Sequence, residues 1–227
     1  MGHVDVGEMR ALATYAERAA RTTESSLGPE ERYLLAELAW LDGLLAVASG
    51  DLPGLQEPGA RIQGAGDWIL QRLARSLAAL ELALSGEPHV AADSIYALEM
   101  LVPPEEPPML WTSAIFEEMP VNQAVNRLAA GRWLLAAGDT LRAEELLSWQ
   151  EVFHPPAIKV NGIVAGLARL ELARIEEARG NWIAAGDLYR WFLRADPIDD
   201  YADLAAEARE AVERLDGVLE TSDAVGT

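Results

Sequence analysis

Apolar side chains recur every three or four residues along most of this chain, with polar or charged side chains between them. This spacing places the apolar residues on one face of an α-helix, so the pattern predicts a succession of amphipathic helices. Gly and Pro residues separate these segments, as is typical of helix ends. The predicted helices span residues 5–22, 29–49, 67–85, 89–101, 121–137, 140–153, 158–179, 182–195 and 201–219. The predicted fold class is therefore all-α.

One stretch of the chain lacks this pattern, between residues 51 and 66. It contains Pro53, Gly54, Pro58 and Gly59. Pro cannot donate a backbone hydrogen bond and clashes with the preceding helical turn, while Gly weakens a helix through its conformational freedom. We therefore expect a loop or one short turn there, at the end of a degenerate first unit.

A fixed spacing, Gly-x4-Ala-x3-apolar-x7-Pro, recurs in the chain and joins pairs of predicted helices. The three matches are Gly86, Ala91, Ile95 and Pro103; Gly138, Ala143, Leu147 and Pro155; and Gly180, Ala185, Tyr189 and Pro197. The Gly suits a left-handed helix end, the small Ala lets the two helices approach, and the apolar residue fills the space between them. The Pro ends the second helix. The spacing therefore predicts three repeated helix–turn–helix units.

This spacing resembles that of the tetratricopeptide (TPR) repeat, a helix–turn–helix unit of about 34 residues. The family's small position in the first helix corresponds to Ala79, Gly131 and Ala173. The family's Trp position departs from the pattern and holds Arg75, Arg127 and Arg169. The resemblance covers about residues 67–218. It implies a right-handed TPR-like solenoid of antiparallel helix pairs with a C-terminal capping helix.

The repeat divides the chain into three predicted parts. Residues 1–66 form an N-terminal helical pair and the degenerate first unit. Residues 67–219 form three TPR-like units and the capping helix, and residues 220–227 form a flexible tail.

An insertion at residues 104–121 lengthens one interval of the repeat. It carries Pro residues, acids and an apolar cluster that includes Trp111 and Phe116. Either these aromatic side chains fold into the gap between units, or they form an apolar knob that binds a partner.

Composition and charge exclude several classes of function. The 227 residues carry a formal net charge of −19, whereas a nucleic-acid surface needs a basic footprint. The same charge disfavours anionic membranes, and no apolar run is long enough to span a bilayer. The start of the chain has no secretory pattern, so we expect a cytoplasmic protein without nucleic-acid or membrane partners.

Residues for metal binding and catalysis are scarce. The chain has no cysteine, and Lys159 is its only lysine. Its histidines, His3, His89 and His154, lie far apart, and none has another His or a Cys three or four positions away, as a zinc site would. We expect no catalytic residues, no metal and no cofactor.

The resemblance also implies a binding surface, because the first helices of stacked units line the concave groove of such solenoids. The groove positions correspond to Arg132 in one unit and to Glu171, Arg174 and Glu177 in the next. Two stacked guanidinium groups, from Arg132 and Arg174, could clamp a peptide carboxylate or an acidic side chain. The alternative is that each arginine pairs with a neighbouring glutamate.

These features together favour protein–protein interaction as the function: an adaptor or scaffold that receives a peptide or a partner subunit in the groove. A second hypothesis is a structural subunit of a larger assembly, docked through residues 104–121. A third is a small-molecule sensor or enzyme that uses the groove. The chain resembles the TPR regions of bacterial signalling proteins, and a homo-oligomer is compatible with each hypothesis.

Overall fold

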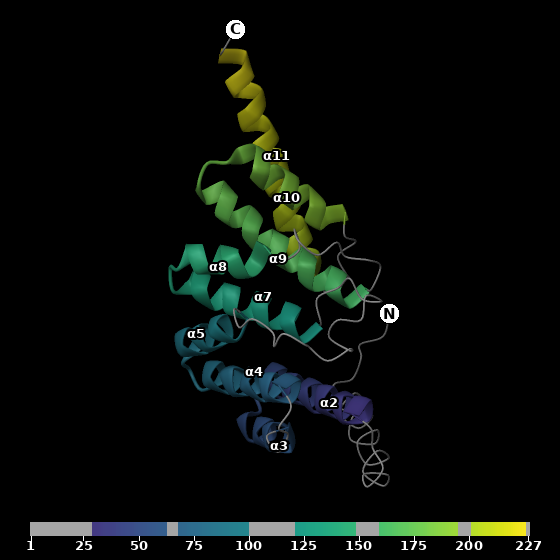
Figure 1. Ribbon diagram of the computed structural model, residues 1–227. Coiled ribbons are helices and arrows are strands. Elements are labelled where there is room, and N and C mark those ends of the chain that lie inside the picture. Colours follow the sequence, from purple (N-terminus) through teal and green to yellow (C-terminus); the bar gives the residue numbers. More distant parts are fainter. Residues whose placement is uncertain (1–28, 63–67, 100–120, 149–158, 195–200, 226–227) are drawn as a thin grey trace. The chain divides into compact units, whose positions relative to one another are not determined.

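The structure is a computed structural model, and it describes residues 29–62, 68–99, 121–148, 159–194 and 201–225. Within these ranges the regular elements are all α-helices (Figure 1). They are α2 (Pro29–Ala48), α3 (Leu52–Ile62), α4 (Trp68–Leu84), α5 (Pro88–Glu99), α7 (Val121–Ala136), α8 (Thr140–Leu147), α9 (Lys159–Ala178), α10 (Trp182–Arg194) and α11 (Ala202–Val225). The predicted all-α class is therefore confirmed.

The chain forms two compact units, Met1–Trp111 and Thr112–Thr227. In the first unit, α2 packs on α3 and α4, and α4 packs on α3 and α5. In the second unit, α7 packs on α8 and α9, α9 packs on α8 and α10, and α10 packs on α11. Each unit therefore has two successive helix pairs, and the second unit adds α11.

The same turn joins the two helices of each pair. Gly50, Gly86, Gly138 and Gly180 all have positive φ, between +67° and +93°. Each Gly donates its N–H to the carbonyl oxygen three residues earlier, at 3.0 or 3.1 Å, and the next residue donates to the carbonyl oxygen five residues earlier, at 2.9 Å. This is the Schellman arrangement, in which a left-handed residue satisfies the last carbonyl groups of a helix. The predicted role of the repeated Gly is confirmed at the three predicted positions and also at Gly50.

The residue after each Gly immediately precedes the next helix. In the three predicted units, the N–H of Ala91, Ala143 and Ala185 donates to the carbonyl oxygen of the acid or amide four positions earlier, at 3.0 to 3.2 Å. At one junction the side chain caps as well, because Asp139 Oδ1 accepts from the N–H of Arg142 at 3.2 Å. Asp139 is therefore the N-terminal cap of α8.

The small and apolar positions of the repeat lie in the core. The side chains of Ala91, Ala143, Ala185, Ile95 and Leu147 have no exposed area. In the second unit, a Cβ added at Gly131 of α7 would lie only 2.7 Å from Cγ of Leu147 in α8. The backbone of α7 therefore approaches α8 so closely that only glycine fits.

The prediction of a loop at residues 51–66 is wrong, because α3 fills most of that stretch. Asp51 caps the helix, and its Oδ1 accepts from the N–H of Gly54 at 3.0 Å. Pro53 lies in the first turn, where backbone N–H groups have no partner within the helix and a proline removes nothing.

The second proline of α3 lies inside the helix. Pro58 is buried together with Leu55 and Ile62. These three residues are spaced by three and four positions, so they share one face, and α3 packs on both α2 and α4. Burial of this apolar face stabilises the helix enough to offset the hydrogen bond that Pro58 cannot donate.

Several predictions concern parts of the chain outside the described residues: the helix at 5–22, the insertion at 104–121, and Pro103, Pro155 and Pro197. Helix α11 extends to Val225, so its predicted end near residue 219 is wrong. None of the described helices is both long and apolar enough to cross a bilayer.

Candidate functional site

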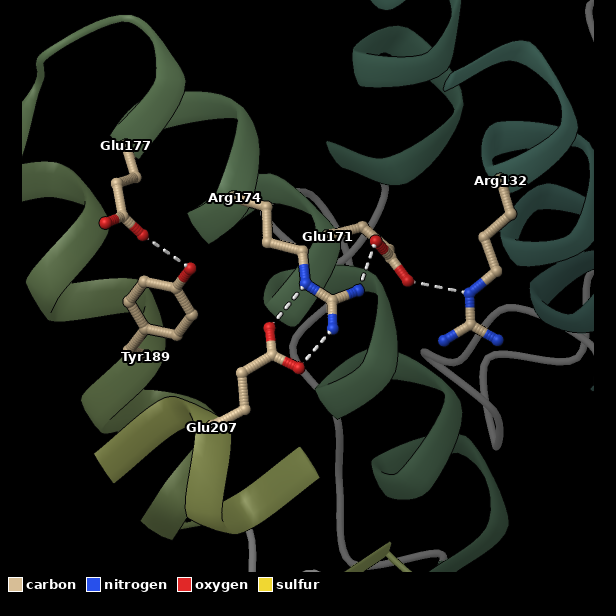
Figure 2. Close-up of polar contacts among 6 residues, drawn as sticks. All are labelled: Arg132, Glu171, Arg174, Glu177, Tyr189 and Glu207. Carbon is tan, nitrogen blue, oxygen red and sulfur yellow. Dashed lines mark hydrogen bonds and ion pairs between the residues drawn. The ribbon is translucent and has the colours of Figure 1, made fainter. Parts of the chain in front are cut away.

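Charged side chains from three helices of the second unit meet along one face of α9. Glu171, Arg174 and Glu177 follow one another at intervals of three residues, so they project from the same side of this helix. Figure 2 shows Arg132 of α7, Tyr189 of α10 and Glu207 of α11 directed toward them. We call the set of Arg132, Glu171, Arg174, Glu177, Tyr189, Glu207 and Arg214 the α9 polar face.

Glu171 is the centre of this face. Glu171 is only 6% exposed, and each of its carboxylate oxygens has a cationic partner. Nε of Arg132 donates to Oε1, and Nη1 of Arg174 donates to Oε2, both at 2.8 Å (Figure 2). A buried carboxylate is costly unless it is paired, and the two arginines supply this pairing for Glu171.

Arg174 also holds α11. Its Nε and Nη2 donate to the two carboxylate oxygens of Glu207, at 2.8 and 2.7 Å. This bidentate arrangement is the strongest geometry for an arginine and a carboxylate. The hydrogen bonds from Arg174 lower the pKa of Glu207, and those from Glu207 and Glu171 raise the pKa of Arg174. All three nitrogen atoms of the Arg174 guanidinium are therefore used within the protein.

A second cluster joins α9, α10 and α11. The Tyr189 hydroxyl donates to Oε2 of Glu177 at 2.9 Å. Arg214 of α11 donates to Oε1 of the same carboxylate, with Nε at 3.2 Å and Nη2 also in contact. Burial raises the pKa of Tyr189, and its hydrogen bond to Glu177 adds to the effect, so the hydroxyl stays protonated and acts as a donor.

The structure shows the partners of both predicted groove arginines. Arg132 and Arg174 both contact Glu171, so they lie close together, as predicted for stacked positions. Each also pairs with a neighbouring glutamate, as the alternative predicted: Arg132 with Glu171, and Arg174 with Glu171 and Glu207. Glu177 lies on the same face but binds Tyr189 and Arg214. Trp111 and Phe116 lie outside the described residues.

Arg132 differs from Arg174 in one respect. Its side chain is 41% exposed, and only Nε has a hydrogen bond or ion pair with the described residues. Nη1 and Nη2 make no contact with the other residues drawn in Figure 2. Among the residues of the α9 polar face, Arg132 therefore keeps the donors needed to bind a second carboxylate.

Sequence reasoning missed Tyr189, Glu207 and Arg214 as members of this face. Together with Arg174 and Glu177 they border a pocket of about 410 Å³ between α9, α10 and α11. Tyr189 was predicted only as a packing residue of the repeat. Glu207 and Arg214 were part of the predicted capping helix, and no spacing in the sequence links them to α9.

The described residues contain no group of three or more His, Asp or Glu side chains placed to hold a metal ion. A scan against models of protein families found no match. Searches of curated proteins and of solved structures also found no match.

Proposed function

We propose that this chain is a TPR-like, right-handed helical solenoid that acts as a protein–protein interaction module, an adaptor or scaffold for a peptide or partner subunit. The support is the repeated local structure. The same Gly turn joins four helix pairs in the described residues, and the packing of first helix on second helix and on the next first helix is the same in both units. Such repeats bury their apolar faces only by stacking, and the resulting surfaces commonly bind other proteins.

One observation supports this binding mode: Nη1 and Nη2 of Arg132 have no hydrogen bond or ion pair with the described residues. A peptide carboxylate can approach Nη1 and Nη2 without displacing Glu171 from Nε. Binding at Arg174 would instead require the rupture of its contacts with both Glu171 and Glu207. We therefore place the peptide anchor at Arg132 and assign Arg174 the role of holding the face together.

This proposal can be tested with the full chain as bait in extracts of its native source. The comparison is between wild type, Arg132→Ala and Arg209→Ala, followed by mass spectrometry and affinity measurement of the retained protein. Arg209 is an exposed arginine of α11 outside the α9 polar face, so its loss changes the net charge equally. We expect Arg132→Ala to weaken binding by about tenfold or more, since a hydrogen bond to a charged group contributes about 1.5–3 kcal/mol.

Two results would contradict the proposal. One is a partner that binds wild type and Arg132→Ala equally. The other is equal weakening by Arg132→Ala and Arg209→Ala, which would indicate a general effect of charge. Circular dichroism of the variants is the control for folding, because Arg132 also contacts the buried Glu171.

A further inference from the structure

Four charged side chains of the α9 polar face form a continuous row across three helices. In Figure 2 they follow one another in the order Arg132 of α7, Glu171 and Arg174 of α9, and Glu207 of α11. The hydrogen bonds that join them measure 2.7 or 2.8 Å. The charges alternate in sign along the row, so each of the two inner side chains is shared by two partners of opposite charge.

Because they are shared, the inner side chains Glu171 and Arg174 cannot pair fully with both of their neighbours. Arg174 gives Nε and Nη2 to Glu207 and only Nη1 to Glu171. The hydrogen bonds with Glu207 are the largest cause of the raised pKa of Arg174. Glu171 accepts one hydrogen bond from each arginine, and its side chain is only 8% exposed, so these two bonds offset the cost of its burial.

Loss of the contact with Glu207 would change this division. Arg174 would then have no second carboxylate that competes with Glu171 for its guanidinium. Members of one hydrogen-bond network act on one another, so a stronger pair between Arg174 and Glu171 weakens the demand of Glu171 on Arg132. More of the charge of Arg132 is then left for a carboxylate from outside the chain.

We propose that α11 regulates the carboxylate anchor at Arg132: its contact with α9 through Glu207 weakens the anchor, and loss of that contact strengthens it. This inference rests on the proposed function, because it concerns the regulation of the same anchor. Coupling between two equilibria is reciprocal, so a carboxylate bound at Arg132 weakens the contact between Arg174 and Glu207 to the same extent. Helix α11 is then a regulatory element of the binding site, in addition to its packing on α10.

The test compares wild type with Glu207→Gln and with Glu210→Gln, each as the full chain. Glu210 is an exposed residue of the same helix and has no ion pair among the described residues, so Glu210→Gln removes an equal charge without changing the row. Sodium acetate is the probe carboxylate, titrated against sodium chloride at constant ionic strength. Binding is followed by NMR at the Nε–H group of Arg132, which is assigned by its absence in Arg132→Ala.

We expect Glu207→Gln to lower the acetate dissociation constant about twofold or more, the lower end of the coupling within one ion-pair network. Glu210→Gln should leave the dissociation constant nearly unchanged. Circular dichroism spectra that match wild type are the control for folding.

The coupling is also measurable without any ligand. Urea denaturation of wild type, Arg132→Ala, Glu207→Gln and the double variant gives a double-mutant cycle. Glu171 depends more on Arg174 when Arg132 is absent. We therefore expect Glu207→Gln to raise the unfolding equilibrium constant about twofold less in Arg132→Ala than in wild type. The same cycle with Glu210→Gln should be additive.

Three results would overturn the inference alone. They are weaker acetate binding by Glu207→Gln than by wild type, equal effects of Glu207→Gln and Glu210→Gln, and an additive cycle of Arg132→Ala with Glu207→Gln. Acetate that leaves the Arg132 signal unchanged in every protein would instead contradict the anchor itself, and with it both the proposed binding mode and its regulation.

Discussion

At the scale of single residues, glycine occurs in the repeat for two different physical reasons. Gly138 has a φ of +84°, and a Cβ at this position would meet no other atom. Gly131 has no positive φ, but a Cβ there would lie 2.7 to 3.2 Å from three carbon atoms of Leu147. The first glycine is therefore required for backbone conformation, and the second is required for space.

Gly131→Ala should lower the free energy of unfolding by about 1–3 kcal/mol, the usual cost of overpacking. The nearest atom is Cγ of Leu147, close to the backbone, and this side chain has no exposed area into which it could move. Gly217→Ala is the matched control, since this glycine of α11 has open space around it. This substitution should raise the free energy of unfolding by about 0.4–1 kcal/mol. Urea denaturation tests whether Gly131→Ala lowers the free energy of unfolding and Gly217→Ala raises it. A stabilising Gly131→Ala would show that α7 and α8 approach less closely.

At the scale of elements, the amphipathic pattern was a sufficient guide to most helices, including α2, α4, α7, α9 and α10. It failed at α3, because rules for Pro and Gly describe the helix alone, whereas the burial of Leu55 and Ile62 against neighbouring helices stabilises this one. Gly50 followed by Asp51 has the same order as Gly138 followed by Asp139, and this local similarity was the available signal for a complete helix pair. Pairing across helices, such as Arg174 with Glu207, depends on how elements pack, and no local pattern encodes it.

Glu207→Gln should weaken the attachment of α11 to α9. Arg174 lowers the pKa of Glu207 below its ordinary value of 4.5, so the pair stabilises the fold at pH values above about 4.5 and loses this effect as the pH falls through the lowered pKa. Because the Glu207 side chain is 44% exposed, solvent screening limits the cost of Glu207→Gln to about 0.2–1 kcal/mol at pH 7.

The measurement is urea denaturation of wild type and Glu207→Gln between pH 7 and pH 3, with hydrogen exchange of α11 amides at pH 7. We expect the difference between the two proteins to shrink toward zero at low pH. Glu213→Gln is the control, because Glu213 has no ion pair among the described residues and should show no such dependence. A difference that stays constant with pH would mean that Glu207 acts through packing.

At the scale of the whole molecule, each of the two units has its own buried core. In Met1–Trp111 the core includes Trp40 and Leu77, and the Trp40 indole N–H donates to the Ser76 hydroxyl at 3.0 Å. Also in this unit, Arg72 is buried against Glu99 at 2.6 Å. In Thr112–Thr227 the core includes Leu146 and Leu170, and the hydrogen bonds described above for the α9 polar face lie inside that unit.

We therefore expect the fragment Thr112–Thr227 to fold without the rest of the chain. Its size is within the usual range of single domains, and α7 to α11 bury their apolar faces on one another. The fragment should show a helical circular dichroism spectrum and one cooperative urea transition. The change in unfolding free energy caused by Glu207→Gln should match that in the full chain, because both partners of the ion pair remain. A fragment that is helical but unfolds without cooperativity would mean that the second unit needs Met1–Trp111 to complete its core, and a smaller effect of Glu207→Gln in the fragment would locate that dependence at α11.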